Sequence, residues 1–340
     1  MLFFRAGVLI VATCFWLMCG LSAFADSPLA GLQSSGSIAS SVVTTQIVSE
    51  KTADAQDNSV EEMQKAGAVA IAEGRYDEAL RQFTKSIEQS PAPGYGNRCL
   101  VHLQMQHYRA AIEDCTESLA IAQNPEVKMN LGLAYEQIGE HALAIIQYES
   151  MISANIADYR VYYNLALAEA ATGAHQMAIG SYTQALRELP ADVLNPIQGD
   201  IYRDRGASYL VLANYVAAVT DLNAAIRYDP NDLWAYFNRG CAYHRSHNFL
   251  PALQDFNWVI EKDSHNARAY FNRGMIYARL GQSTVAIENL TQALQRFPKD
   301  AQSKDMLVSI HQAQQLIDQL ESEAADSTVF SFLRDRPLSS

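Results

Sequence analysis

Proline and strand-forming runs are scarce in this sequence, and their scarcity favours a helical fold. Ten prolines occur among the 340 residues, which leaves room for long helices. Alternating β-branched runs hardly appear outside SSVVTTQIV at residues 40–48, so almost no strand is predicted. Because 49% of the residues are hydrophobic, wholesale disorder is excluded.

Basic charge and catalytic motifs are also lacking. Lys and Arg number 25 against 37 Asp and Glu, which disfavours nucleic acid and anionic membranes as main partners. No Walker lysine loop, HExxH, GxSxG or CxxC motif occurs, and GYGN at residues 94–97 has too few glycines for a phosphate loop. His244 and His247 match no standard ligand spacing, so we interpret them as turn residues. The sequence therefore predicts no catalytic residue, no metal site, no small-molecule cofactor and no enzymatic activity.

Cysteine is too sparse for a disulfide framework. Of the five cysteines, two lie in the apolar N-terminal segment, which leaves Cys99, Cys115 and Cys241. An odd number without CxxC spacing favours buried thiols over disulfides or a zinc site. Cys99 and Cys115 are expected to lie close together, but packed helices rarely offer disulfide geometry.

The N-terminus predicts export. A single basic residue in MLFFR precedes an apolar run at residues 6–24, and Ala23-Phe24-Ala25 offers a small-x-small cleavage site. We therefore predict a signal peptide at residues 1–25 and a periplasmic or equivalent lumenal location. The alternative is an uncleaved membrane anchor through residues 6–24. A linker at 26–58, rich in Ser, Thr, Ala and Gln, is predicted to be disordered.

A pentapeptide repeats at a fixed distance. YFNRG occurs at residues 236–240 and again at 270–274, 34 residues later, and looser copies lie at 202–206 and 95–99. A frame that starts seven residues before the last position of the pentapeptide finds seven units. They begin near Val60, Ala92, Pro125, Tyr159, Gly199, Leu233 and Ala267.

Equivalent slots of these units carry equivalent residues. The eighth slot is always small, and the twentieth is alanine in every unit, at Ala79, Ala111, Ala144, Ala178, Ala218, Ala252 and Ala286. Helical spacing of apolar residues predicts two short helices per unit. Glycines near slots 14 to 16 suit the end of the first helix, at Gly74, Gly139, Gly173 and Gly281. Small residues at slots eight and twenty let the helices approach, and stacked units share one core.

These residues resemble the tetratricopeptide repeat family over about residues 60–300. The resemblance implies an all-α, right-handed superhelical solenoid whose first helices line a concave, protein-binding groove. We expect repeats 1–4 at residues 59–198 and repeats 5–7 at 199–300, divided by an insertion that disturbs the stacking. A capping helix is predicted at 301–321, followed by a flexible tail at 322–340.

The sixth slot points to binding. Five of seven units place Asn there, the slot reading Lys65, Asn97, Asn130, Asn164, Asp204, Asn238 and Asn272. If the resemblance holds, this slot faces the groove, where an amide can bond the backbone of an extended peptide through its donor and its acceptor. The alternative is that these amides help neighbouring units to stack.

The last three units add arginines and aromatics, the residue types that anchor protein interfaces. They are Trp234, Phe237, Phe271, Arg203, Arg245, Arg268 and Arg279. A cationic groove suggests an acidic or carboxylate-terminated ligand. The predicted peptide-binding set is Asn97, Asn130, Asn164, Arg203, Asn238, Arg268, Asn272, Trp234, Phe237 and Phe271.

A subset of the family clamps the C-terminal carboxylates of chaperones. Units five to seven match that pattern at Arg203, Asn238 and Arg268 but depart from it at Ala207 and Asn272. Together with the predicted export, these departures disfavour a cytosolic chaperone. The prediction is a non-enzymatic scaffold or adaptor that binds a protein or peptide outside the cytoplasm. The alternative is a regulatory subunit that holds and activates an envelope enzyme such as a hydrolase or protease.

Overall fold

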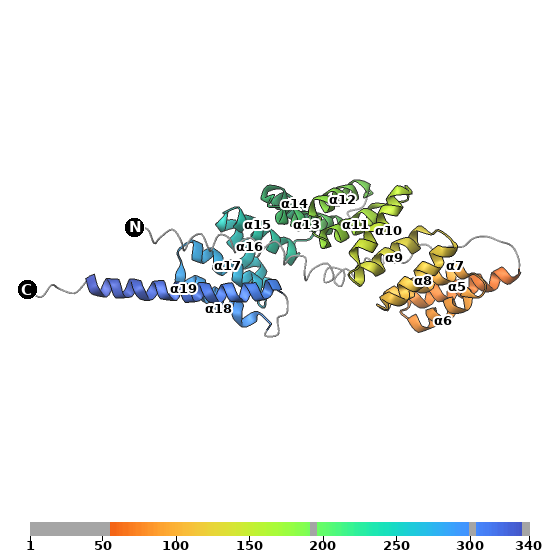
Figure 1. Ribbon diagram of the computed structural model, residues 1–340, viewed down its shortest axis with the longest axis horizontal. Helices are drawn as coiled ribbons and strands as arrows, with labels where there is room; N and C mark the ends of the chain where they lie inside the picture. Colours follow the sequence, from red (N-terminus) through yellow and green to blue (C-terminus); the bar gives the residue numbers. More distant parts are fainter. Residues whose placement is uncertain (1–54, 191–195, 299–303, 335–340) are drawn as a thin grey trace, which may run out of the picture. The chain divides into compact units, whose positions relative to one another are not determined.

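The computed structural model describes residues 55–190, 196–298 and 304–334 (Figure 1). These ranges form fifteen helices and no strand, which confirms the all-α prediction. The predicted signal peptide, the linker up to residue 54 and the end of the predicted tail at 335–340 lie outside the described residues. None of the described helices has the length and hydropathy of a membrane span.

The chain divides into two compact units between residues 193 and 194. The N-terminal unit holds four helix pairs, α5 (Ala55–Ala72) with α6 (Tyr76–Ile87), α7 (Pro91–Gln104) with α8 (Tyr108–Ile121), α9 (Pro125–Gln137) with α10 (His141–Ser153), and α11 (Tyr159–Ala171) with α12 (His175–Glu188). The C-terminal unit holds α13 (Pro196–Val211) with α14 (Tyr215–Tyr228), α15 (Leu233–Arg245) with α16 (Phe249–Lys262), α17 (Ala267–Arg279) with α18 (Ser283–Arg296), and the long α19 (Lys304–Arg334).

Two helices begin earlier than the sequence predicted. The first, α5, starts at Ala55, so the last four residues of the predicted linker are helical, because no proline or glycine breaks this stretch. Helix α13 starts at Pro196 rather than at 199, and proline is well suited to a first helical position.

Each helix pair turns at the same residue of the repeat. The fifteenth slot lies in the left-handed region in all seven pairs, with φ of 71°, 79°, 83° and 73° at Gly74, Gly139, Gly173 and Gly281. These values confirm the predicted role of the turn glycines. The remaining three pairs place Gln106, Ala213 and His247 in the same conformation, with φ of 60°, 58° and 62°.

The helices of a pair cross where a glycine meets a large side chain. A Cβ atom at Gly132 would lie 2.5 Å from the Tyr148 ring, and one at Gly240 would lie 3.0 Å from the Phe256 ring. The glycine of slot eight thus faces slot twenty-four first, a refinement of the expected contact between slots eight and twenty. All seven slot-twenty alanines are fully buried. Because the two helices of a pair approach so closely at this crossing, slots eight and twenty require small residues.

In α7 and α8 the crossing holds a disulfide instead. Cys99 occupies slot eight and Cys115 slot twenty-four, and their sulfurs are bonded, with a Cα–Cα distance of 5.4 Å. The prediction of two buried thiols was therefore wrong. A crossing that brings a Cβ so close to the facing side chain also brings two cysteines within bonding distance. Cys241 is a buried thiol, as expected.

The recurring pentapeptide builds a clasp between the two helices of a pair. Its arginine pairs with the carboxylate sixteen residues later, as Arg239 does with Asp255 through two bonds of 2.9 and 2.7 Å. The same guanidinium lies 5.1 Å from the ring centroid of Tyr236, the first residue of the pentapeptide. Equivalent pairs are Arg98–Asp114, Arg205–Asp221 and Arg273–Asn289. The pentapeptide recurs because this clasp recurs.

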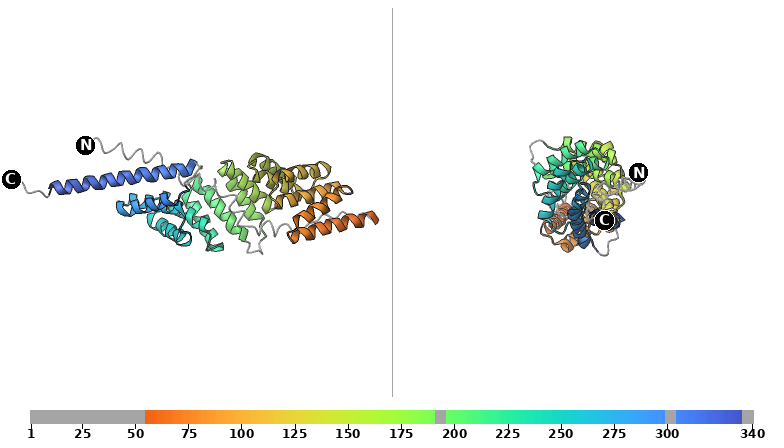
Figure 2. Two further views of the ribbon diagram at one scale, coloured as in Figure 1. Left: turned by 90° about the horizontal axis from the view of Figure 1, so that it is seen from below. Right: turned by 90° about the vertical axis from the view of Figure 1, so that its left-hand side faces the viewer.

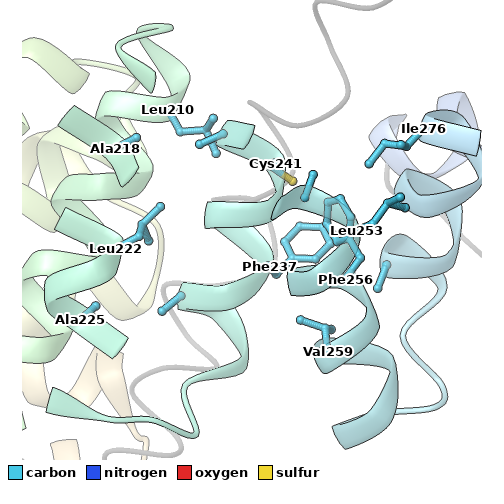
Figure 3. Close-up of a cluster of buried hydrophobic side chains, with 14 residues drawn as sticks. Leu210, Ala218, Leu222, Ala225, Phe237, Cys241, Leu253, Phe256, Val259 and Ile276 are labelled. Carbon is cyan, nitrogen blue, oxygen red and sulfur yellow. The ribbon is translucent and has the colours of Figure 1, made fainter. Parts of the chain in front are cut away.

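Stacked pairs share a continuous core in the C-terminal unit. Phe237 of α15 and Phe256 of α16 meet edge to face at 5.7 Å, between Leu222 of α14 and Ile276 of α17 (Figure 3). Aromatic pairs of this geometry stabilise beyond the area that they bury. The α15–α16 pair is thus held from both sides by its neighbours.

Helix α19 caps the last pair. It lies beside α18 (Figure 2). Its residues Ala313 and Ile317 are buried in one cluster with Phe271 of α17 and Leu290 of α18. The helix continues to Arg334, so the predicted end of the capping helix at residue 321 was wrong. Residues 322–334 contain no proline or glycine and include adjacent alanines, which explains the continuation.

First helices of successive pairs touch one another. Helix α7 packs on α9, and α9 on α11; in the C-terminal unit α13 packs on α15, and α15 on α17. Second helices of successive pairs make fewer such contacts. We call the slot-six side of the first helices the inner face.

Candidate functional site

The slot-six amides of the N-terminal unit are half-buried on their first helices. The Nδ2 atom of Asn97 is buried and has no acceptor among the described residues. The Nδ2 atom of Asn164 lies 3.4 Å from the Met129 sulfur, a weak acceptor. Hydrogen-bonding capacity therefore remains unused at this slot.

In the C-terminal unit this slot is more deeply buried. Asn238 is 4% exposed, and its Oδ1 atom accepts no hydrogen bond from the part of the chain that the structure describes. Asn272 is 5% exposed, and its Nδ2 atom donates to the Arg268 carbonyl at 2.9 Å. A buried acceptor without a donor is unfavourable, so Asn238 is not explained by folding alone.

Arg203 is surrounded by acid. Its guanidinium contacts Asp200 at 2.7 Å, Asp204 at 2.9 Å and Asp232 at 3.3 Å. Burial raises the pKa of Asp200 although Arg203 opposes that shift. Three carboxylates around one cation leave this corner of the inner face net negative. The expectation that Arg203 attracts an acidic ligand does not fit this arrangement.

Two predicted contact residues belong to the core. Phe237 is 6% exposed and Phe271 is 3% exposed, and each packs in a buried cluster. Slot five points toward the neighbouring pair rather than toward solvent, so the assignment of these rings to peptide contact is corrected. Trp234 is half-buried, and its ring lies 6.4 Å from that of Phe237, edge to face. It remains on the inner face with Arg268, which is also half-buried.

Arg245 differs from the other partly buried arginines. It lies in the last turn of α15, and its Nη2 atom is buried without an acceptor among the described residues. By contrast, the clasp arginine Arg239 on the same helix is fully engaged by Asp255 and Asn223. The sequence indicated Arg245 as one of several arginines in the last three units and gave no sign that it differs from the others.

Two histidine–carboxylate pairs each lie within a single helix pair. His102 is 3.7 Å from Asp114, and burial lowers its pKa. His141 is 3.2 Å from Glu136, whose pKa is raised by burial. Across the described residues, no three His, Cys, Asp or Glu side chains gather as a metal site would require. Each histidine therefore pairs with a carboxylate on the other helix of its own repeat.

Three segments match family models. Residues 199–246 match the model described as TPR repeat, and residues 99–159 and 267–300 match two models described as tetratricopeptide repeat. Together the segments cover parts of both units.

Relatives and solved structures agree with these matches. The human mitochondrial import receptor subunit TOM34 is 27% identical over 106 residues, which are 28% of this chain and 34% of that protein. The chain thus spans about a third or less of the length of the curated relatives that it matches. A repeat protein from Cytophaga hutchinsonii aligns with a TM-score of 0.54 at 17% identity, over 72% of this chain and 98% of that one. A tetratricopeptide repeat protein from Parabacteroides merdae aligns with a TM-score of 0.53 at 16% identity, over 78% and 99%. These two likenesses concern the fold.

Proposed function

Because this chain is a tetratricopeptide-repeat protein, we propose that it is a non-enzymatic scaffold that holds a protein or peptide partner on the inner face of its first helices. The observation that carries this proposal is the unused bonding capacity of the slot-six amides. The half-buried Asn97 lacks an acceptor for its Nδ2 atom among the described residues, and an extended peptide backbone offers acceptors. A scaffold role is also in keeping with the human relative, which is by name a subunit of an import receptor.

The partner segment is extended rather than helical. Each repeat offers one slot-six side chain, and a chain laid along successive first helices can bond several of them in turn. Contacts to backbone amides discriminate little between sequences, so side chains elsewhere on the inner face set the specificity.

The compartment is extracytoplasmic. The Cys99–Cys115 disulfide supports this part of the proposal, because such bonds persist in oxidising compartments and are rare in the cytosol of mesophiles. A signal peptide at residues 1–25 would deliver the protein there, and an uncleaved anchor at 6–24 would tether it to the membrane instead.

Two measurements test the proposal together. Affinity purification of the tagged protein from native extract should recover a stoichiometric protein partner that is lost from a variant with Asn97, Asn130 and Asn164 changed to Ala. Alkylation of free thiols in intact cells should leave Cys99 and Cys115 unmodified. Equal recovery by the triple variant would contradict the binding face, and full alkylation of both cysteines would contradict the compartment.

A further inference from the structure

We propose that the last helix pair, α17 and α18, carries a phosphate-binding site in which Arg273 and Arg296 are the cationic contacts. The side chain of Arg273 bonds to residues of α16 and α18, so the site lies on the side of the second helices. It is separate from the inner face, and it does not depend on the proposed scaffold function. The feature that points to it is a clasp in which an amide replaces the carboxylate.

The clasp of this pair differs from those of α7–α8, α13–α14 and α15–α16, which are ion pairs. Arg239 donates from Nε and Nη2 to the two carboxylate oxygens of Asp255, at 2.9 and 2.7 Å. Arg273 instead donates from Nε to the one amide oxygen of Asn289 at 2.7 Å, and the amide nitrogen of Asn289 donates to the Val285 carbonyl. Asn289 thus accepts one bond where a carboxylate accepts two, and it brings no negative charge.

The positive charge of Arg273 is not offset by an ion pair. Its Nη1 atom donates to the amide oxygen of Asn257 at 2.8 Å, so this second acceptor is also neutral. In the described part of the chain no carboxylate pairs with it, and Glu288, whose charge acts on it from α18, is exposed. Burial lowers the pKa of Arg273. At Arg239 burial also acts to lower the pKa, but the bonds to Asp255 outweigh it and raise the pKa.

A second guanidinium lies against the same aromatic ring. The Cζ atoms of Arg273 and Arg296 lie 5.3 Å and 4.4 Å from the ring centroid of Tyr270, so they are no farther apart than these two distances together. Arg296 bonds only neutral oxygens, the carbonyls of Ser264 and Gln292 at 2.7 and 3.0 Å and the Gln292 amide oxygen at 2.6 Å. The ring offsets part of the charge of two cations that repel each other. An anion that contacts both would offset the rest.

Phosphate is the ligand that matches this pair of cations. A phosphate monoester carries a charge of about −1.5 to −2 near neutral pH and presents three strong acceptor oxygens. Guanidinium groups bond phosphate oxygens two at a time, with defined geometry. Both arginine side chains are half-buried rather than enclosed, so a ligand can reach them from solvent. The free ion and a monoester share this chemistry.

Titration calorimetry with small anions provides the direct test. Sodium phosphate, O-phosphoserine and sodium acetate would each be titrated into the purified protein at constant ionic strength. The parent should bind phosphate or phosphoserine with a Kd of about 1 mM or lower, and acetate at least about tenfold more weakly. Comparison of phosphate with phosphoserine distinguishes the free ion from a monoester. Equal binding of acetate, or no binding of either phosphate ligand, would overturn the inference.

Asn289→Asp tests whether the missing carboxylate makes the site. It restores the ion pair of the other clasps, so it should weaken phosphate binding at least about tenfold and melt at or above the parent temperature. Arg273→Gln should weaken phosphate binding by a similar factor. The exposed control Arg227→Gln should bind phosphate as the parent does.

The outcomes of these variants are decisive for the inference alone. Phosphate binding that survives in Asn289→Asp or in Arg273→Gln would place the anion elsewhere and overturn the inference. Circular dichroism checks that each variant is folded, and Asn289→Asp, which keeps every guanidinium, decides the matter if Arg273→Gln unfolds. Recovery of a protein partner through the slot-six amides is a separate measurement, so failure here leaves the proposed function standing.

Discussion

At the residue scale, slot fifteen is where the residue type disagrees with the backbone conformation in three of the seven repeats. Gly281 and its three glycine equivalents accept a positive φ without strain, whereas Ala213 adopts φ of 58° with a Cβ atom present. An L-residue in this conformation is disfavoured by roughly 1–2 kcal/mol. At Ala213 the fold of the repeat therefore imposes a backbone conformation that alanine disfavours.

This disagreement predicts opposite effects for two matched substitutions. Ala213→Gly should raise the free energy of unfolding by about 1 kcal/mol, because glycine accepts the positive φ. The greater conformational entropy of the unfolded glycine variant offsets part of this gain. Gly281→Ala should lower it by a similar amount, because its Cβ would meet nothing within 4 Å and only the backbone conformation is penalised. Urea denaturation of the two variants and the parent measures both changes. A destabilised Ala213→Gly variant would show that the turn is held by contacts rather than by backbone preference.

The repeat frame could be predicted from the sequence, but the charges around single residues could not. Alanine at slot twenty and glycine at slot eight are local requirements of a helix crossing, so they could be predicted. Asp200 and Asp204 flank Arg203 in the sequence, but the third carboxylate could not be predicted, since Asp232 comes from the cap of the next first helix. The clasps left a signal that was missed, an arginine in the pentapeptide followed sixteen residues later by Asp or Asn.

At the scale of elements, the helix crossing sets what each pair tolerates. Ala252 and Ala286 are fully buried at crossings whose opposite helix leaves no room for a larger side chain. Ala252→Leu or Ala286→Leu should lower the free energy of unfolding by about 2–3 kcal/mol, because overpacking forces the helices apart. Thermal melts followed by circular dichroism provide the measurement. Melts that coincide with the parent's would mean that the repeat frame is displaced.

The crossing of α7 and α8 is stabilised by a bond rather than by packing. The disulfide closes a loop of sixteen residues, and the chain-entropy account gives such a loop about 3 kcal/mol. Reduction should therefore lower the melting temperature of the protein. The variant with Cys99→Ala and Cys115→Ala should melt low from the start and ignore the reductant. An equal response of parent and variant to reductant would contradict a structural disulfide.

The disulfide also marks a limit of sequence reasoning. Slots eight and twenty-four place Cys99 and Cys115 next to each other, which the repeat frame indicated. Whether two neighbouring thiols bond depends on the distance between two backbones, 5.4 Å between these Cα atoms, and residue spacing alone does not give that distance.

At the scale of the whole molecule, two surfaces are candidates for partner binding. The inner face carries the slot-six amides and Trp234. The second helices of the C-terminal unit instead expose apolar side chains, with Val216 81% and Leu250 74% accessible at equivalent positions of successive repeats. Exposed apolar groups of this kind also attract partners. We assign binding to the inner face, where buried side-chain atoms lack hydrogen-bond partners among the described residues.

Site-specific photo-crosslinking tests directly whether the partner binds on the inner face. A benzoylphenylalanine residue would be placed at position 234 on the inner face, or at position 216 or 250 on the second helices, and each protein irradiated in native extract. We expect that position 234 gives a specific protein adduct and that positions 216 and 250 give none. A specific adduct from positions 216 and 250, with none from position 234, would contradict the claim that the partner binds on the inner face.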